Sequence, residues 1–443
     1  MTVRPSLFAR ALKGGALTAG AYAATQVLRL ASNLILTRLL FPEAFGLMAL
    51  VSVVLVGLQM FSDAGIGPSI AQSPRGDDPE FLDTAWTAQV LRGVILWLGT
   101  LGLAGPVAAL YDAPDLARLL PVAGLTLLIA GFNPTRIDTA NRHLLLGRVT
   151  ALDLVAQTIG IGAMVALALA LGTVWALVIG AIIGSLAKLA LMHFGLPGHM
   201  NRPRWERAAG AEILHFGKWI FLSTACGFLL SQGDKAILGA YLPLEGLGVY
   251  NIGYFLASFP LMLAGAVTSR IMIPLYREHP PAISPANRAR LRQLRFGISG
   301  GVIALLAVLA LTGPALVGLL YDDRYAAAGG IVVAIAVVQM PVVIGMTYDQ
   351  AALAAGDSRN YFLVMALRAG AQTLAFLIGA EAGGLGGALL AQGLAGLSAH
   401  LAIIWLARRH RVWDGAHDAT LVFLAATVAA TALWLHANLL PGL

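Results

Sequence analysis

The stretch TQVLRLASNLILTRLLFPEAFG, residues 25–46, is mostly apolar and long enough to form part of a membrane span, yet Arg29 lies in its middle. A charged side chain near the centre of a span costs about 3 kcal/mol, so it faces the protein interior, a wet cavity or a charged partner. The polar residues around it are spaced four, three, four and four apart: Tyr22, Gln26, Arg29, Asn33 and Thr37. This spacing places all of them on one helical face, which predicts a helix whose polar stripe points into a bundle.

The composition predicts that such helices recur along the chain. Hydrophobic residues make up 58% of the 443 residues and charged residues only 12%, whereas soluble domains have about 25% charged residues. Apolar runs of about 20 residues are typical of membrane helices, not of the short alternating strands of a barrel. We therefore predict an all-α polytopic membrane protein. The single cysteine, Cys226, excludes a disulfide framework and a cysteine-rich metal site.

Polar loops divide the chain into about thirteen apolar segments. These segments are 14–40, 43–66, 84–110, 117–139, 150–171, 173–196, 213–241, 245–275, 293–320, 328–352, 360–379, 384–407 and 419–437. We expect two pseudo-symmetric six-helix bundles plus about one extra C-terminal helix. The predicted parts are an N-terminal bundle (1–200), a basic cytoplasmic linker (201–212), a C-terminal bundle (213–410) and the extra transmembrane helix (411–443).

The basic residues predict the orientation of these spans. If the N-terminus is cytoplasmic, the inside segments hold most of the arginines, among them Arg288, Arg292 and Arg295, while the outside segments hold little beyond Arg118 and Arg324. Cytoplasmic loops carry an excess of Lys and Arg, so we predict a cytoplasmic N-terminus. The basic N-terminal segment leads into an apolar run with no clear processing site, and we interpret this run as an uncleaved first span.

An internal repeat relates the two predicted bundles. NLILTRLLFPEAFG, residues 33–46, aligns without gaps with KAILGAYLPLEGLG, residues 235–248; LAGPVAALYD, residues 103–112, resembles LTGPALVGLLYD, residues 311–322. Both matches link a span to the span six places later, so the two halves should share one orientation about an axis along the membrane normal. In transporters built this way the substrate site lies between the halves, near the middle of the bilayer.

Three prolines within the predicted spans indicate kinks. They are Pro134, Pro260 and Pro341. A proline removes a backbone hydrogen bond and bends the helix. Kinked helices suit a bundle that rocks between two conformations, and kinks without mobility are an equal alternative.

Other charged residues within the predicted spans are functional candidates by the same reasoning. They include the cations Arg92, Lys218 and Arg368 and the carboxylates Asp63, Asp138, Asp153, Asp234 and Asp349. Arg29 either contacts an anion in a central cavity or pairs with a carboxylate or with helix carbonyls. Asp63 and Asp349 are expected at the C-terminal ends of helices, where the dipole disfavours negative charge, so each predicts a cationic partner or a gating role. We place Asp63, Asp234 and Asp349 as candidates for gating or ion coupling.

Catalytic and metal-binding patterns are absent from the sequence. No pair of the nine histidines has the spacing of metal ligands, and the GxSxG, Walker A and GxGxxG motifs do not occur. The sequence therefore predicts no enzyme activity, no catalytic residue, no cofactor and no metal. Without a nucleotide site, transport would use an ion gradient or follow the gradient of the substrate.

Several quoted stretches resemble a known family. ILTRLLFPEAFGLMALV (35–51), FSDAGIGPSIAQS (61–73) and LYDAPDLARLLPVAGLTLLIAGF (110–132) are similar to the N-terminal half of bacterial polysaccharide exporters. DKAILGAYLPLEGLGVYNIGYFLAS (234–258) looks like their seventh and eighth helices. These exporters are the O-antigen and exopolysaccharide flippases of the multidrug/oligosaccharidyl-lipid/polysaccharide (MOP) superfamily. The resemblance covers most of residues 14–410.

The resemblance implies a function and a set of contacts. It implies two six-helix bundles that alternate access and move an undecaprenyl-pyrophosphate-linked oligosaccharide from the cytoplasmic to the periplasmic leaflet of the inner membrane. It also implies partners such as a polysaccharide polymerase and chain-length or export proteins. The pyrophosphate needs cations, for which Arg29, Arg92 and Lys218 are the candidates. The sugars need hydrogen-bonding groups, for which the candidates are Gln26, Asn33, Asn251 and Tyr254.

Two other kinds of function remain as alternatives. Another MOP exporter, either a lipid II flippase or a small-molecule cation antiporter, would share the fold, although an antiporter for organic cations calls for an acidic cavity and the charges in these spans are mainly basic. A membrane-embedded glycosyltransferase or polymerase would need a catalytic loop outside the membrane, and the predicted outside loops are only a few residues long. The loop arginines are explained by topology, so we expect lipid-bilayer contacts and no nucleic-acid partner.

Overall fold

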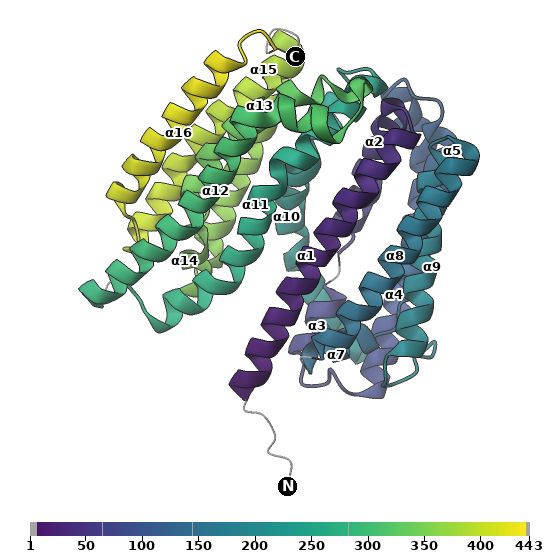
Figure 1. Cartoon of the computed structure of the whole chain (residues 1–443). Helices are drawn as coiled ribbons and strands as arrows, with labels where there is room; N and C mark the ends of the chain where they lie inside the picture. Colours follow the sequence, from purple (N-terminus) through teal and green to yellow (C-terminus); the bar gives the residue numbers. More distant parts are fainter. Residues whose placement is uncertain (1–6, 64, 144, 282, 440–443) are drawn as a thin grey trace. The chain divides into compact units, whose positions relative to one another are not determined.

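The computed structural model of the protein describes residues 7–63, 65–143, 145–281 and 283–439 (Figure 1). Within these ranges, the side chains of residues 7–19, 21, 22, 146, 214–223 and 270 lie outside the described part. The described residues form helices and no strands. The chain divides into two compact units, Met1–Ala225 and Cys226–Leu443, and each is described by itself.

Unit 1 contains nine helices among its described residues and the start of a tenth. They are α1 (Leu7–Leu39), α2 (Pro42–Phe61), α3 (Ile66–Gln72), α4 (Pro79–Leu110), α5 (Leu116–Ala123), α6 (Leu125–Gly131), α7 (Arg136–Arg142), α8 (Leu146–Leu171) and α9 (Trp175–Gly195), followed by α10 (Arg207–Leu238). Helices α8 and α9 form the most extensive pair and α1 packs against α8. Gly160 and Gly184 let the first pair approach closely, because a Cβ on Gly160 would lie 2.9 Å from the Cα of Gly184.

Unit 2 receives the end of α10 and contains the remaining helices. They are α11 (Leu244–Glu278), α12 (Pro285–Leu320), the short η1 (Asp323–Tyr325), α13 (Ala328–Gly345), α14 (Asp349–Ala354), α15 (Ser358–Arg409) and α16 (Gly415–Leu435). Helix α13 is the most buried of the candidate spans, since 72% of its apolar window is buried. It packs against α11, α12, α15 and α16, which together enclose the core of this unit.

Helix α15 contains 52 residues and is a folded-back pair of arms. A straight helix of that length would be about 78 Å long, more than twice the roughly 30 Å of the hydrocarbon core. The backbone is non-helical at Gly383 and Gly384, and Gly384 has a φ of 58° that favours glycine. The two arms then touch, because a Cβ on Gly379 would lie 2.3 Å from the carbonyl oxygen of Gly387. The break falls between the predicted segments 360–379 and 384–407.

The membrane character of the chain follows from these helices. Among the described residues, nine helices are long and apolar enough to cross a membrane, and one bent set, α5–α6 with α7, brings the number to ten. When α15 counts as two arms and α1 and α10 are included, each of the thirteen predicted segments has a helical counterpart. The prediction of an all-α polytopic membrane protein is confirmed.

The internal repeat falls on equivalent places in the two units. In residues 33–46 the repeat spans the end of α1 and the start of α2, and in residues 235–248 it spans the end of α10 and the start of α11. The second match covers the C-terminal ends of α4 and α12, each of which contains an internal proline, Pro106 and Pro314. The repeated sequences therefore encode the same helix junctions. The domain boundaries predicted around 201–212 stay a prediction.

Candidate functional site

The polar stripe on α1 is only partly buried. Gln26 and Thr37 are buried, Asn33 is half-buried, and Arg29 is exposed. Thr37 donates its hydroxyl to the backbone oxygen of Asn33 at 2.9 Å, so it is satisfied within its own helix. The side chain of Tyr22 lies outside the described part. The stripe thus offers Arg29 at its exposed centre, with neutral polar groups one turn to either side.

Arg92 links α4 to the end of α2. Its Nε donates to Ser62 Oγ at 3.0 Å and its Nη2 donates to the backbone oxygen of Gln59 at 2.7 Å. Asp63 follows α2 directly and is an electrostatic neighbour of Arg92. Its Oδ1 accepts the N–H of Gly65 at 2.9 Å and closes the turn into α3. Arg92 and Asp63 therefore lie at one helix break, which the sequence did not indicate.

The candidates on α10 and α11 form a second group. Asp234 is buried and accepts the hydroxyl of Tyr250 at 2.7 Å, while its Oδ1 has no partner among the described atoms. The ammonium of Lys235 lies 4.9 Å from the ring centroid of Tyr254, a cation–π contact. Asn251, three residues earlier on α11, is half-buried. The side chain of Lys218 lies outside the described part, so its predicted role is not placed here.

Asp349 lies at the start of a helix, contrary to the expected C-terminal end. Helix α13 ends at Gly345, and Asp349 occupies the first turn of α14. Arg368 Nη1 donates to Asp349 Oδ2 at 2.9 Å, and both side chains are largely buried. The predicted cationic partner is therefore present on α15, and it leaves Asp349 Oδ1 buried without a hydrogen bond.

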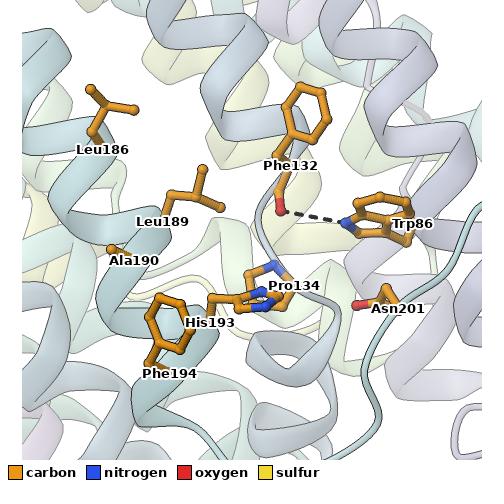
Figure 2. A pocket seen from close by; sticks show the side chains of 9 residues that line it. All are labelled: Trp86, Phe132, Pro134, Leu186, Leu189, Ala190, His193, Phe194 and Asn201. Carbon is orange, nitrogen blue, oxygen red and sulfur yellow. Dashed lines mark hydrogen bonds between the residues drawn. The ribbon is translucent and has the colours of Figure 1, made fainter.

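The fourth span of unit 1 is broken after α6. The α6–α7 direction changes by 57° between Gly131 and Arg136, at the predicted Pro134. The side-chain amide of Gln89 on α4 lies within hydrogen-bond distance of three freed carbonyl oxygens, those of Ala130, Gly131 and Asn133, at 3.2–3.3 Å. Trp86, one turn earlier, donates its Nε1 to the carbonyl of Phe132 at 3.4 Å (Figure 2). Neutral donors on α4 thus hold the opened backbone.

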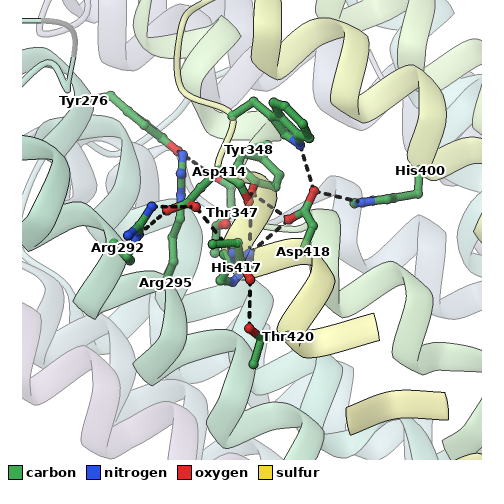
Figure 3. Close-up of polar contacts among 12 residues, drawn as sticks. Tyr276, Arg292, Arg295, Thr347, Tyr348, His400, Asp414, His417, Asp418 and Thr420 are labelled. Atoms are coloured by element: carbon green, nitrogen blue, oxygen red, sulfur yellow. Dashed lines mark hydrogen bonds and ion pairs between the residues drawn. The ribbon is translucent and has the colours of Figure 1, made fainter. Parts of the chain in front are cut away.

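The corresponding span of unit 2, Ala328–Ala354, continues across the membrane but is interrupted by a turn at residues 346–348, between α13 and α14. We call this turn the second break, and an ionisable cluster surrounds it (Figure 3). Asp418 on α16 accepts four hydrogen bonds there. The donors are Tyr348 Oη at 2.7 Å, Trp413 Nε1 at 2.9 Å, His417 Nδ1 at 3.0 Å and His400 Nε2 at 3.3 Å. The second ring nitrogens of both histidines, His400 Nδ1 and His417 Nε2, are buried without partners among the described atoms. We call Tyr348, His400, Trp413, His417 and Asp418 the Asp418 cluster.

Arg295 extends the cluster toward α11. It is 2% exposed, donates Nη2 to the hydroxyl of Tyr276 at 2.7 Å, and lies 4.3 Å above the ring of Tyr348. The Tyr276 hydroxyl in turn donates to the carbonyl of Thr347 at 3.0 Å, within the break. Arg292, three residues earlier on α12, forms a bidentate pair with Asp414. Arg295 was expected among the cytoplasmic loop charges, whereas the structure buries it between two aromatic rings.

These residues were missed for identifiable reasons. The arginines at 288, 292 and 295 were counted as evidence of topology, yet their spacing of four and three places them on one helical face. The adjacent His417 and Asp418 stand at the start of the last segment, where a polar pair is common. Only the packing of α13–α14, α15 and α16 brings them together.

The predicted linker is bound along α4. Asp83 Oδ1 accepts from His199 Nε2 at 2.7 Å and from the N–H of Arg202 at 2.9 Å, and Thr84 Oγ1 accepts the N–H of Glu206 at 3.1 Å. Glu206 and Asp78 both pair with Arg75, and these hydrogen bonds raise the pKa of Arg75. The segment His199–Glu206, which we call the docked loop, is therefore part of unit 1.

No group of three or more His, Cys, Asp or Glu side chains in the part of the chain that the structure describes is arranged to hold a metal ion. The described polar residues instead offer hydrogen-bond donors, guanidinium groups and carboxylates inside an apolar bundle. Such groups can bind a charged headgroup or exchange a proton.

The chain matches a family model described as "Polysaccharide biosynthesis protein" over residues 35–329, more than half of its length. Among curated proteins, it is 24% identical over 249 residues to the lipopolysaccharide biosynthesis protein WzxC of Escherichia coli (strain K12), covering 55% of this chain and 50% of WzxC. It is 21% identical over 244 residues to the succinoglycan biosynthesis transport protein ExoT of Rhizobium meliloti (strain 1021), covering 55% and 49%. The chain spans about half the length of the curated relatives it matches.

Solved structures of MOP transporters resemble the fold. The lipid II flippase MurJ in an inward closed conformation gives a TM-score of 0.68 at 12% identity, covering 95% of this chain and 98% of MurJ. An inward-facing multidrug resistance MATE family transporter gives a TM-score of 0.63 at 17% identity, covering 87% and 94%. At such identities the likeness shows the fold alone.

Proposed function

Because the chain belongs to the polysaccharide biosynthesis protein family, we propose that it is a flippase for a lipid-linked oligosaccharide. The substrate is an undecaprenyl-pyrophosphate-linked repeat unit, which passes from the cytoplasmic to the periplasmic leaflet of the bacterial inner membrane for exopolysaccharide, O-antigen or capsule synthesis. The protein acts by alternating access, has its N-terminus in the cytoplasm, and is a transporter with no enzymatic step. The family match over residues 35–329 carries this proposal.

The intramembrane residues support this substrate chemistry. A pyrophosphate is a multiply charged anion, and guanidinium groups bind such anions through paired N–H donors. Arg29 is exposed on a span and is flanked by Gln26 and Asn33. Together with Arg92 and Lys218, it forms the proposed set of cationic contacts.

The sugar contacts come from neutral polar groups. We assign Gln26 and Asn33 on α1 and Asn251 and Tyr254 on α11 to this role, because sugar hydroxyls require both donors and acceptors. Asp63, Asp234 and Asp349 are assigned to gating or ion coupling. A buried carboxylate oxygen without a partner, present in Asp234 and in Asp349, is a place where a proton can be taken up or released.

The protein partners follow from the same role. A flipped repeat unit must be consumed on the periplasmic side, which requires a polymerase together with chain-length or export proteins. A lipid II flippase or a small-molecule cation antiporter would use the same fold. The mainly basic charges proposed for the cavity favour an anionic substrate over an organic cation.

The decisive experiment removes the gene and identifies the lipid-linked intermediate that accumulates on the cytoplasmic side. Accumulation of an undecaprenyl-pyrophosphate oligosaccharide with loss of surface polysaccharide is expected. Accumulation of lipid II instead would replace the proposal by the lipid II alternative, and unchanged polysaccharide export would refute it.

Arg29→Ala should abolish export while the protein still inserts in the membrane, and Arg29→Lys should retain part of the activity because it keeps the charge. Surface polysaccharide and the amount of membrane-inserted protein are measured for each variant. Arg38→Ala is the matched control, since Arg38 is also exposed on α1 but lies in its last turn, near the membrane interface. Normal export by Arg29→Ala would remove Arg29 from the substrate path.

A further inference from the structure

A groove opens beside the broken span of unit 1, between α4, the α6–α7 break and α9. We call it the α9 groove, and its volume is about 540 Å³. Figure 2 shows its lining: Trp86 from α4, Phe132 from the break, Leu186, Leu189 and His193 from α9, and Asn201 from the docked loop. All these elements belong to unit 1, so the groove is formed within one compact unit.

The upper part of the groove is open to hydrocarbon. Helix α9 is a candidate membrane span with a mean hydropathy of 2.0. On its groove side, Leu186 is 49% exposed. Phe132 on the opposite wall is 40% exposed, and its ring stacks edge-to-face with Trp86 at 6.3 Å. Exposed apolar side chains on a span are solvated by lipid chains, so the space between these walls is filled by hydrocarbon.

The lower part of the groove contains a titratable ring. His193 lies seven residues, about 10 Å along the helix axis, from Leu186, and its ring packs edge-to-face against the exposed ring of Phe194 at 5.2 Å. The backbone oxygen of His193 accepts a hydrogen bond from Arg136, but the ring nitrogens have no hydrogen-bond partner among the described residues. The side-chain amide of Asn201 also lines the groove, but it is engaged, because it hydrogen-bonds with Thr135 and donates to the carbonyl of Leu82. An apolar slot that ends beside an imidazole matches a molecule with a hydrocarbon tail and a polar head.

The docked loop makes this polar end positive. Its carboxylates and those of α4 are engaged, because Glu206 pairs with Arg75 and Glu80 pairs with Arg204. Asp83 accepts from His199 and from the N–H of Arg202. The exposed Arg202 guanidinium has no partner among the described residues, so the loop carries unneutralised positive charge next to Asn201. Positive charge at this level of a span attracts anionic lipid headgroups.

We propose that the α9 groove binds one anionic membrane phospholipid, with an acyl chain between α4 and α9 and its phosphate at His193 and Arg202. The chain contacts Phe132 and Leu189, beside the backbone that the break exposes. The lipid fills the notch that the 57° bend leaves in the wall of the bundle. A zwitterionic lipid can occupy the same slot but gains less from the positive end.

Fluorescence quenching by brominated lipid tests the proposal directly, because Trp86 lines the groove. In a variant that keeps Trp86 and replaces the other seven tryptophans by phenylalanine, the protein is reconstituted with a low mole fraction of phosphatidylglycerol brominated on its acyl chain. The control variant keeps only Trp405, which is 47% exposed on α15 outside the groove. Quenching of Trp86 should be several-fold larger than that of Trp405, and brominated phosphatidylethanolamine should remove much of the difference.

Two further variants separate the parts of the site. Arg202→Gln should reduce the preference for phosphatidylglycerol while leaving the quenching by phosphatidylethanolamine unchanged. Ala190→Phe, which fills the groove, should lower the quenching of Trp86 by both lipids. If the tryptophan replacements prevent folding, the wild-type protein and Ala190→Phe are compared by native mass spectrometry for retained phosphatidylglycerol, and retention should be lost in the variant.

Equal quenching of Trp86 and Trp405 by both lipids would overturn the proposal, since the groove would then hold only bulk lipid. Equal retention of phosphatidylglycerol by the wild type and Ala190→Phe would overturn it as well. Displacement of brominated phosphatidylglycerol by added undecaprenyl phosphate, with no effect of dioleoylphosphatidic acid, would assign the groove to an isoprenoid chain and also contradict the phospholipid.

Discussion

The two units break the same span in chemically different ways. In unit 1 the break at Pro134 exposes carbonyl oxygens, and neutral donors, Gln89 and Trp86, approach them from α4. In unit 2 the break between α13 and α14 is surrounded by charged and titratable groups, of which Tyr348, His417 and Arg295 are the most buried. The two halves therefore share an architecture but stabilise the interrupted helix differently. In unit 1 neutral side chains hydrogen-bond to the backbone, and in unit 2 charged side chains surround it.

The two breaks differ in whether a proton or an ion can change the interactions around them. An amide donor keeps the same hydrogen bonds at every physiological pH, so the first break has a fixed set of partners. Carboxylate and imidazole groups can each bind or release a proton, which changes the charge that their neighbours face. Unit 2 therefore contains the break that a proton or an ion can influence. The following predictions test this contrast, from the largest expected effect to the smallest.

Asp418→Asn should have the largest effect. Removing the charge from a buried group that accepts four hydrogen bonds should destabilise the protein by about 3–5 kcal/mol, because one of the two acceptor oxygens becomes an amide NH2 that faces two donors. Thermal unfolding in detergent measures the change. Asp153→Asn is the control, since Asp153 pairs with Lys188 at a position where both side chains are about two-fifths exposed, and the loss should stay within about 1 kcal/mol. Similar losses in both variants would remove the special role of the Asp418 cluster.

Gln89→Leu should cost less, about 1–3 kcal/mol, because it deprives the carbonyls at the first break of their donor but leaves no buried charge. The unfolding temperature should also change by the same amount at pH 5 and pH 8 if the first break is insensitive to protons. Gln157→Leu on α8 is the control, since Gln157 is half-buried and makes no hydrogen bond with another described residue. A pH-dependent loss in Gln89→Leu would contradict the contrast between the two breaks.

Gly93→Ala tests how closely α4 must approach the first break. An added Cβ would lie 3.0 Å from the Cα of Gly131 and 3.1 Å from the carbonyl of Leu127, so we expect a loss of about 1–2 kcal/mol through overpacking. Gly102→Ala on the same helix has no atom within 4 Å of the new Cβ and should be neutral or slightly stabilising. Unfolding of the two variants side by side is the measurement, and equal behaviour would show that α4 can move away from α6.

The smallest effect concerns Asp414, the N-cap residue that precedes α16. Burial acts to raise the pKa of Asp414, but the hydrogen bonds from Arg292 and from the N–H of His417 outweigh it, so the pKa lies below its ordinary value. A depressed pKa in the folded state gives stability that is complete above about pH 4 and is lost as the pH falls through the folded value. Arg292→Gln should raise this pKa and move the loss to higher pH.

The matched change in unit 1 is His143→Gln. The hydrogen bond from His143 lowers the pKa of Asp77, a half-exposed residue in the loop before α4. Unfolding temperatures of both variants between about pH 6 and pH 3 give the comparison, and the shift should be smaller for the more exposed pair. A larger acid sensitivity in His143→Gln than in Arg292→Gln would place the stronger proton response in unit 1.

The spans were predictable from sequence because lipid demands long, continuous apolar segments. The helix breaks were not, because they depend on distant residues. Pro134 and Pro260 were both expected to kink a span, yet Pro134 lies at a break whereas α11 continues through Pro260. The second break has no proline within it. What decides the outcome is whether a partner such as Gln89, more than forty residues away, can satisfy the freed carbonyls.

The candidate site was predictable only where a charge interrupts a span. Arg29, Asp234 and Asp349 were proposed in this way. Asp349 does pair with Arg368, although the C-terminal helix position from which a cationic partner was predicted is wrong. Arg295 was not predicted as a site residue, because an arginine near the end of a span was interpreted as part of a cytoplasmic loop. Its burial between Tyr276 and Tyr348 depends on the folding of α11 and α14 against α12. Sequence periodicity describes one helix at a time, whereas this cluster forms only where several helices pack together.

The docked loop sets a limit on how the chain can be divided. If the two repeated halves descend from a duplicated gene, the segment that joins them would be the natural place to separate them again. In this protein the segment His199–Glu206 forms hydrogen bonds with Asp83 and Thr84 and an ion pair with Arg75. The connecting segment is therefore bound to the first half. A cut that separates the halves therefore has to fall after Glu206, because only then does the N-terminal fragment keep all of these contacts.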